Sequence, residues 1–135
     1  MVPYDRSRAR AEIIEIFRPL YQDPSAISNP DRHLAVLQSI SENLPPSFKP
    51  SKAQLETPHY YGIDMIASPS LRDRLLTLTA DIARNFICDL GAVIEEREGM
   101  GQLTIWGDDL FNNILWELSQ SILEKWDWLL GPVWK

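Results

Sequence analysis

The chain has 135 residues, a net charge of −6 and one cysteine, Cys88, so we expect a single domain without disulfides. The negative charge argues against direct DNA binding, because non-specific affinity for a phosphate backbone comes from Lys and Arg. Without a secretory signal or an apolar run of about 20 residues, the sequence predicts a cytoplasmic or nuclear protein that does not enter a membrane.

The first part of the chain, residues 1–29, is predicted to form one helix followed by a turn. Between Asp5 and Arg18, charged residues alternate with apolar ones at close to the helical period. Pro19 is expected to end this helix because proline lacks a backbone donor. Residues 21–29 are rich in Asp, Pro, Ser and Asn, which are typical of a turn.

A second helix is predicted from Pro30 to about Asn43, with Asn29 as its N-cap. Residues 44–50 contain three prolines, so they are expected to form an extended connector across the surface. The predicted buried stripe of the helix comprises Leu34, Leu37, Ile40 and Leu44.

Two further start signals follow the connector. Ser51 and Gln54 have the spacing of a capping box and predict a short helical turn. Ser68 and Pro69 repeat the cap of the second helix and begin about 25 residues of helical periodicity. Either one long helix covers this segment, or it breaks and a second half is capped by Thr79.

The C-terminal stretch, residues 103–134, contains all five tryptophans and should provide much of the core. Residues 103–106 are predicted to form a short strand or extended segment. A final helix is expected to begin at Asp108 or Asp109, which favour its N-terminus, and to reach about residue 130. Together these elements predict an all-α domain of four to five helices with one short extended segment, residues 1–135 forming a single compact domain.

Three short motifs in this stretch carry a family resemblance. They are Trp-Gly-Asp at 106–108, Trp-Glu at 116–117 and Lys-Trp-Asp-Trp-Leu-Leu at 125–130. Their order resembles the C-terminal signature of a fungal domain of unknown function, which commonly follows the zipper in bZIP-type transcription regulators. The resemblance implies an association with fungal transcription regulation and carries no known activity.

The resemblance extends from about Leu44 to Leu130 and includes a histidine with an aromatic pair at 59–61 and Pro-Ser-Leu-Arg at 69–72. Residues 30–135 are therefore assigned as the family-like core. The chain departs from the usual family architecture because it has neither the long basic helix nor the leucine heptads of a bZIP region.

The densest group of functional side chains lies at 59–64. His59, Tyr60, Tyr61 and Asp64 combine an imidazole, two phenols and a carboxylate, which could form an acid/base site or cross-link backbone in a Pro-rich corner. His33 is expected at the rim of the core. The two histidines and one cysteine form no zinc pattern, so we expect no metal and no other cofactor.

A second group of candidates accompanies the tryptophans. Asp108 and Glu117 are further acid/base candidates, although Asp108 equally suits a helix cap. Glu117 is expected to be partly buried and to pair with Arg72, which would hold the two long helices in register. The candidate ligand-binding residues are Tyr60, Tyr61, Arg72, Trp106 and Trp116.

The sequence is compatible with two functions. The first is an interaction or small-ligand-sensing domain that binds a small molecule or a protein but not DNA. The alternative is a small enzyme of fungal secondary metabolism, of cyclase or isomerase type, which would steer a reactive intermediate in an aromatic-lined pocket. A homodimer is compatible with either function.

Overall fold

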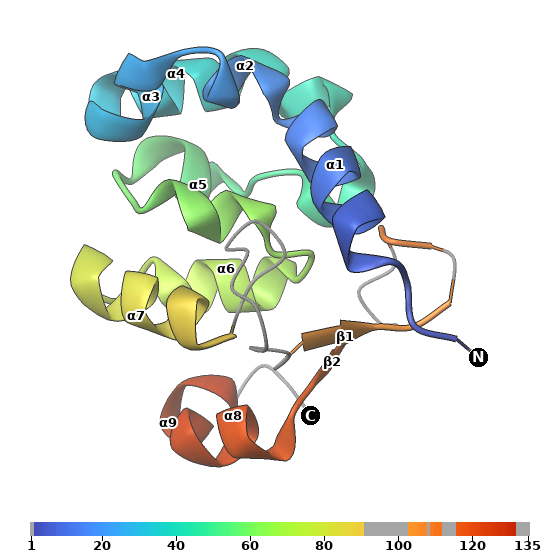
Figure 1. The fold of residues 1–135 in the computed structure, drawn as a ribbon. Helices are drawn as coiled ribbons and strands as arrows, with labels where there is room; N and C mark the ends of the chain where they lie inside the picture. Colours follow the sequence, from blue (N-terminus) through green and yellow to red (C-terminus); the bar gives the residue numbers. More distant parts are fainter. Residues whose placement is uncertain (1, 91–102, 108, 112–115, 132–135) are drawn as a thin grey trace.

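The computed structural model describes residues 2–90, 103–107, 109–111 and 116–131 (Figure 1). Within these ranges the chain forms nine α-helices, three short 3-10 helices and one two-stranded sheet. The predicted predominantly helical class is confirmed, but the helices are more numerous and shorter than the sequence suggested. None of the described helices is long and apolar enough to cross a membrane.

The N-terminal segment forms two helices where one was predicted. Helix α1 (Arg6–Ile16) begins at Asp5, whose carboxylate accepts backbone N–H groups of the first turn. Pro19 ends no helix; it lies in the first turn of α2 (Arg18–Tyr21), where its missing donor is not needed. Residues 2–4 run beside the small sheet, and the Tyr4 amide donates to the Ile105 carbonyl at 2.7 Å.

The turn expected at 21–29 contains a further short helix, α3 (Pro24–Ser28). Helix α4 (Pro30–Ile40) then starts at the predicted cap, since the Asn29 side chain accepts two backbone N–H groups. A 3-10 turn, η1 (Ser41–Asn43), completes the predicted helical segment. Local capping chemistry therefore fixes where this layer of helices begins and ends.

The connector at 44–50 carries one 3-10 turn, η2 (Pro46–Phe48), between otherwise extended residues. The predicted capping box is confirmed at α5 (Lys52–Glu56). The Ser51 hydroxyl accepts the backbone N–H of Gln54, and the Gln54 side-chain oxygen accepts the backbone N–H of Ser51.

The region expected to be the longest helix is divided in two. After the 3-10 helix η3 (Tyr61–Met65), α6 (Pro69–Leu75) is followed by α7 (Ala80–Leu90). The Thr79 hydroxyl accepts the Ile82 N–H at 3.3 Å, so the second of the two alternatives is correct.

The predicted final helix over 108–130 is wrong. Strand β1 (Leu103–Ile105), which was foreseen as an extended segment, pairs antiparallel with β2 (Trp116–Leu118). Two short helices follow, α8 (Gln120–Lys125) and α9 (Asp127–Leu130). Within the described part of the predicted helix, only residues 120–125 and 127–130 are helical.

The reason for this error lies in three residues. Trp116 and Leu118 are buried while Glu117 between them is exposed, which is the alternation of a half-buried strand. Ser119 then caps α8 by accepting the Ile122 N–H. Asp108, the expected helix cap, lies outside the described residues.

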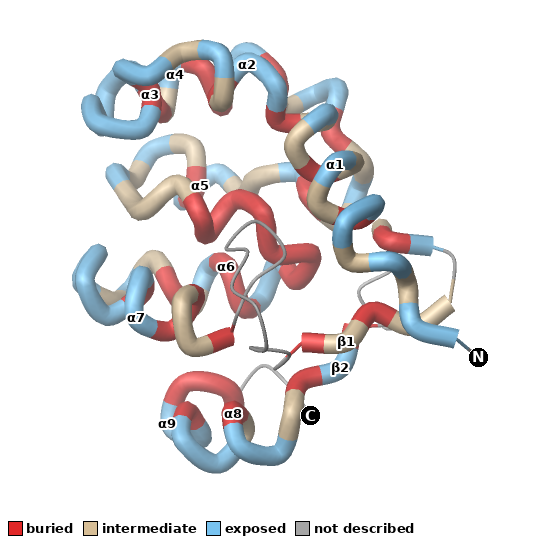
Figure 2. Tube along the Cα trace, viewed as in Figure 1, coloured by how far each residue is buried: buried red, intermediate tan, exposed pale blue. Residues whose placement is uncertain are grey.

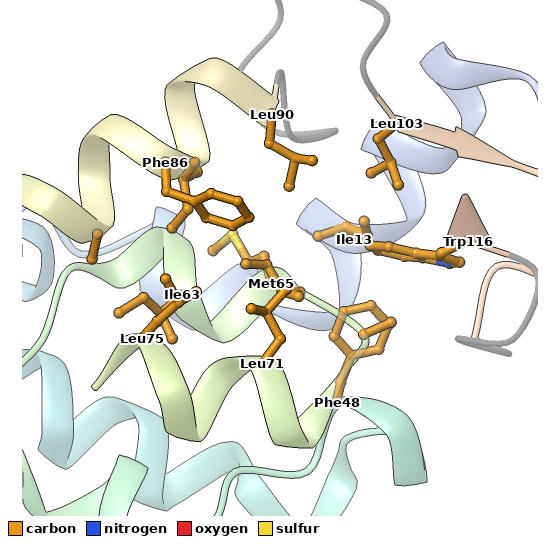
Figure 3. Packing of buried hydrophobic residues seen from close by; sticks show 14 of the residues in the cluster. Ile13, Phe48, Ile63, Met65, Leu71, Leu75, Phe86, Leu90, Leu103 and Trp116 are labelled. Carbon is orange, nitrogen blue, oxygen red and sulfur yellow. The ribbon is translucent and has the colours of Figure 1, made fainter. Parts of the chain in front are cut away.

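The helices and the sheet share one apolar core, which includes buried residues from Ala9 to Leu130 (Figure 2). Phe48 lies where the N-terminal, central and C-terminal parts meet, and Figure 3 shows it close to Ile13 and Trp116. Its ring makes edge contacts with three others. We call these four rings the aromatic cluster: Phe17, Phe48, Phe111 and Trp116.

The tryptophans contribute unequally to this core. Trp116 and Trp126 are buried, Trp106 is half-buried and Trp128 is 51% exposed. Trp126 packs against Phe86 with ring centroids 5.3 Å apart. The fifth, Trp134, lies outside the described residues.

Candidate functional site: a buried polar core beneath a pocket

Arg72 is the most unusual side chain of the core, because it is large, charged and fully buried. Its guanidinium donates to the carbonyl oxygens of Ser47 at 2.7 Å, Lys49 at 2.8 Å and Ile66 at 2.5 Å. It therefore fastens the proline-rich connector to α6. The predicted pair of Arg72 with Glu117 is wrong, because Glu117 is exposed on β2 and Arg72 binds these carbonyls instead.

Gln54 joins Arg72 to a buried carboxylate. The Arg72 Nε–H donates to Gln54 Oε1 at 3.0 Å, and Gln54 Nε2 donates to Asp64 Oδ1 at 2.7 Å. Since an arginine donor requires an oxygen acceptor, this arrangement also fixes the orientation of the amide.

Asp64 is the centre of the network and its side chain has no exposed surface. Besides the Gln54 amide, two imidazoles contact its carboxylate: His33 Nε2 lies 2.7 Å from Oδ2, and His59 Nε2 lies 2.6 Å from Oδ1. These contacts link α4, α5, η3 and the loop that precedes η3. We call His33, Gln54, His59, Asp64 and Arg72 the polar core.

His59 is held so that both of its ring nitrogens must donate. Nδ1 lies 2.6 Å from the Thr57 carbonyl, which can only accept, and Nε2 faces the Asp64 carboxylate. A neutral ring would place a nitrogen lone pair against one of these oxygens. With Asp64 ionised, His59 is therefore an imidazolium.

The pKa shifts agree with this assignment. Burial alone would lower the pKa of His59, but the hydrogen bond to Asp64, its charge and the Thr57 carbonyl outweigh burial and raise it above the usual 6.5. Burial alone would raise the pKa of Asp64, but hydrogen bonds from His33 and His59 and their charges lower it below 3.8. Burial lowers the pKa of Arg72 to about 10, so it stays charged at neutral pH.

His33, His59 and Asp64 also form a set of three metal-ligand types, with donor atoms within 4.8 Å of one another. Ligand atoms around a tetrahedral ion at about 2.0–2.2 Å lie roughly 3.3 Å apart. The contacts of 2.6 and 2.7 Å are instead those of charge-assisted hydrogen bonds. The donor set thus fits shared protons better than a metal ion, and the expected lack of a metal stays a prediction.

A pocket of about 470 Å³ lies over His59. Its remaining walls are Ile27 from α3, Tyr60 and Tyr61 at the start of η3, and Arg84 from α7. The Tyr60 and Tyr61 rings are tilted by 55° with centroids 4.8 Å apart. We call these five residues the His59 pocket. His59 belongs to both sets, and because its side chain is only 2% exposed, its ring lies behind the pocket wall.

Gly62 allows Tyr60 to take its place in this wall. A Cβ atom at position 62 would lie 2.5 Å from the Tyr60 ring, which is closer than real Cβ contacts. The glycine is therefore needed for the close approach of the ring to the backbone of η3.

The structure brings together only some of the predicted site residues. His59 and Asp64 are in direct contact, and Tyr60 and Tyr61 line the pocket. Arg72 belongs to the polar core and not to the pocket wall. Trp106 and Trp116 lie at the small sheet, where the Trp116 indole donates to the Leu110 carbonyl at 2.9 Å.

The sequence interpretation missed Gln54 as a buried bridge, Ile27 and Arg84 as pocket residues, and His33 as a member of the polar core. A signal for His33 existed. It lies four and seven residues before Leu37 and Ile40 on the buried face of α4, so a polar side chain there needs a buried partner. No comparable pattern marks Arg84, which is exposed on α7.

The chain belongs to the family described as Domain of unknown function (DUF3425), whose model matches residues 30–133. This domain is the one found in fungal bZIP-type regulators. No curated protein and no solved structure matches the chain. All five residues of the polar core lie within the matched part, whereas Ile27 of the pocket lies just before it.

Proposed function

We propose that the chain is a small-ligand-binding domain that acts within fungal regulation without contacting DNA itself. The observation that carries this proposal is the shared position of His59. The residue belongs to the pocket wall, while its side chain is only 2% exposed and is bonded to buried Asp64 behind that wall. A ligand that changes the position or charge of His59 therefore acts on contacts among α4, α5 and η3, as a sensing domain requires.

The pocket has the size of known small-molecule sites, which are commonly about 300–1,000 Å³. Its exposed lining is more polar than that of most such sites, which are predominantly apolar, so a ligand with a polar or charged group suits it best. The net charge of −6 supports the expectation that DNA is not the partner. The proposal also includes a location in the cytoplasm or nucleus, binding to a protein partner and formation of a homodimer.

The enzymatic alternative has less support. A general base needs a free acceptor directed at its substrate. Both nitrogens of His59 donate to protein oxygens, and both carboxylate oxygens of Asp64 already accept hydrogen bonds. Neither group offers a free acceptor to a substrate in the pocket.

The test is a thermal-shift screen of a chemically diverse set of small molecules against three proteins: wild type, Ile27→Ser and Ile82→Ser. Ile27 is 46% exposed and lines the pocket, while Ile82 is 38% exposed and does not, so the two variants are matched. We expect compounds that raise the melting temperature of wild type and Ile82→Ser but not of Ile27→Ser. The proposal is wrong if no compound does so, or if every stabilising compound acts equally on Ile27→Ser.

A further inference from the structure

The charge around the His59 pocket differs in sign from that of the whole chain. The exposed guanidinium of Arg84 forms part of its wall. No carboxylate of the described part of the chain lies within ion-pair distance of Arg84. Arg84 also borders a neighbouring hollow that contains Asp81 and Asp89, but Asp89 is engaged by Lys125 at 2.6 Å. Among the described residues, Arg84 is thus a cation of the pocket wall that forms no ion pair.

The buried carboxylate behind the pocket does not cancel this cation. Asp64 carries one negative charge, and the imidazolium of His59 stands between it and the pocket. Arg72 adds a second positive charge, connected to Asp64 through Gln54. The summed charge of the polar core is therefore not negative, and the nearest charged member of this core to the pocket is the buried imidazolium of His59.

The rest of the wall adds aromatic and aliphatic side chains to a lining that is mostly polar. Tyr60 and Tyr61 present two aromatic rings, and Ile27 is an isoleucine with nearly half of its surface exposed. Burial of these surfaces by a flat apolar group is favourable, while a bare inorganic anion leaves them uncovered. The pocket volume of about 470 Å³ also exceeds the needs of such an ion.

We infer that the His59 pocket takes a small organic acid, with its carboxylate at Arg84 and its flat apolar body against Ile27, Tyr60 and Tyr61. This inference rests on the proposed ligand-binding function and names the chemical class of the ligand. A guanidinium is suited to the carboxylate because it can donate two parallel hydrogen bonds.

The probes for the test are 2-naphthoate, its neutral isostere 2-naphthamide, and inorganic phosphate, each titrated by calorimetry. The proteins are wild type, Arg84→Gln, Arg84→Lys and a control, Arg18→Gln, which removes an exposed arginine of α2 that pairs with Glu15. A ligand of this size in a partly open pocket is expected to bind with a Kd of roughly 1 mM or tighter.

We expect wild type and Arg18→Gln to bind naphthoate alike, and Arg84→Gln to bind it about tenfold more weakly, because one charge-assisted contact is lost. Arg84→Lys should recover part of the lost affinity, since lysine keeps the charge but lacks the two parallel donors of the guanidinium. Naphthamide should bind wild type and Arg84→Gln equally, and naphthoate affinity should fall with added salt.

The possible failures are separable. If naphthamide binds as tightly as naphthoate and Ile27→Ser weakens both, the ligand class is wrong and the ligand-binding function stands. If phosphate binds as tightly as naphthoate, the pocket selects anions without an apolar body, which also overturns the inference. If naphthoate does not bind while other compounds stabilise the protein through Ile27, the acid is excluded. If no compound of any class binds, both proposals fail.

Discussion

The polar core and the aromatic cluster connect the layers of the same domain by different forces. In the polar core, each donor meets one particular acceptor, as with Arg72 and the carbonyls of the connector. In the aromatic cluster, Phe48 makes apolar edge contacts with three other rings. Apolar packing tolerates a change of shape, whereas a buried charge left without its partner is costly. The two regions should therefore respond differently to mutation.

The largest effect is expected from Arg72→Met. The substitution keeps apolar volume but removes the N–H groups that donate to three backbone carbonyls and to Gln54. It also removes the positive charge of Arg72 from the surroundings of Asp64. We expect a loss of about 4 to 5 kcal/mol in the free energy of unfolding, measured by denaturant titration.

Arg84→Met provides the matched control for this substitution. Arg84 is exposed and has no ion pair among the described residues, so its replacement should change the free energy of unfolding by less than about 0.5 kcal/mol. Similar small losses at both arginines would mean that the polar core does not hold the connector to α6.

Trp126→Ala tests the apolar core at a buried ring outside the aromatic cluster. Trp126 is buried against Phe86, and its indole N–H donates to Asp89 at 3.1 Å. Its removal should cost about 3 to 4 kcal/mol, as for other large core aromatics. Trp128→Ala, at a site that is 51% exposed, should cost less than about 1 kcal/mol in the same denaturant experiment. Equal losses would contradict the burial difference between the two rings.

The polar core should also make stability depend on pH, which the aromatic cluster cannot do. His59 has a raised pKa in the folded state, so its contribution is fully present below about pH 6.5 and is lost as pH rises through the folded-state pKa. Each unit of such a shift corresponds to about 1.4 kcal/mol. Asp64 has a lowered pKa, so its contribution is present above about pH 3.8 and is lost as pH falls through its folded-state value.

The measurement is the free energy of unfolding between pH 5 and pH 9, for wild type and His59→Gln, with the pH limits set at about two units around the unfolded pKa of histidine. Wild type should lose stability on the alkaline side of about pH 6.5, and the variant should show a flatter profile there. Identical profiles would show that the imidazolium contributes nothing to folding. His33 also contacts Asp64, so the variant need not be flat throughout.

The difference between the two regions also explains which features the sequence could predict. The caps at Asn29, Ser51 and Ser68 were predicted correctly because each acts on backbone groups two or three residues away. The resemblance to the family was likewise readable in short motifs and is confirmed over residues 30–133. Caps and short motifs depend only on residues that are close together in the sequence.

The polar core could not be predicted in this way, because its contacts join residues far apart in the chain. His33 and Asp64 are separated by 31 positions, and Arg72 and Ser47 by 25. Residue types alone indicated a charged pair for Arg72 but did not identify its partner. The pocket was foreseen only at His59, Tyr60 and Tyr61, which are consecutive, while Arg84 and Ile27 reach it from other helices.

The C-terminal error has a related cause. Apolar residues at 111, 115, 118 and 122 fit the helical period, and a strand of three residues is too short to produce a competing alternation in the pattern. The pairing of Trp116 with Ile105 in the sheet is a tertiary contact that overrides this local preference.

The smallest expected effect concerns Glu117, and it separates the strand from the helix that the sequence favoured. In a helix packed against α6, Glu117 would be half-buried and coupled to Arg72. In the structure it lies on the exposed face of β2 opposite Thr104, while Arg72 is bonded to Gln54 and three carbonyls. Glu117→Gln should therefore change the free energy of unfolding by less than about 0.5 kcal/mol. Combined with Arg72→Met in a double-mutant cycle, it should be additive within about 0.5 kcal/mol, because residues without shared partners do not couple. A coupling above about 1 kcal/mol would require the two side chains to meet and would restore the helical arrangement of residues 108–130.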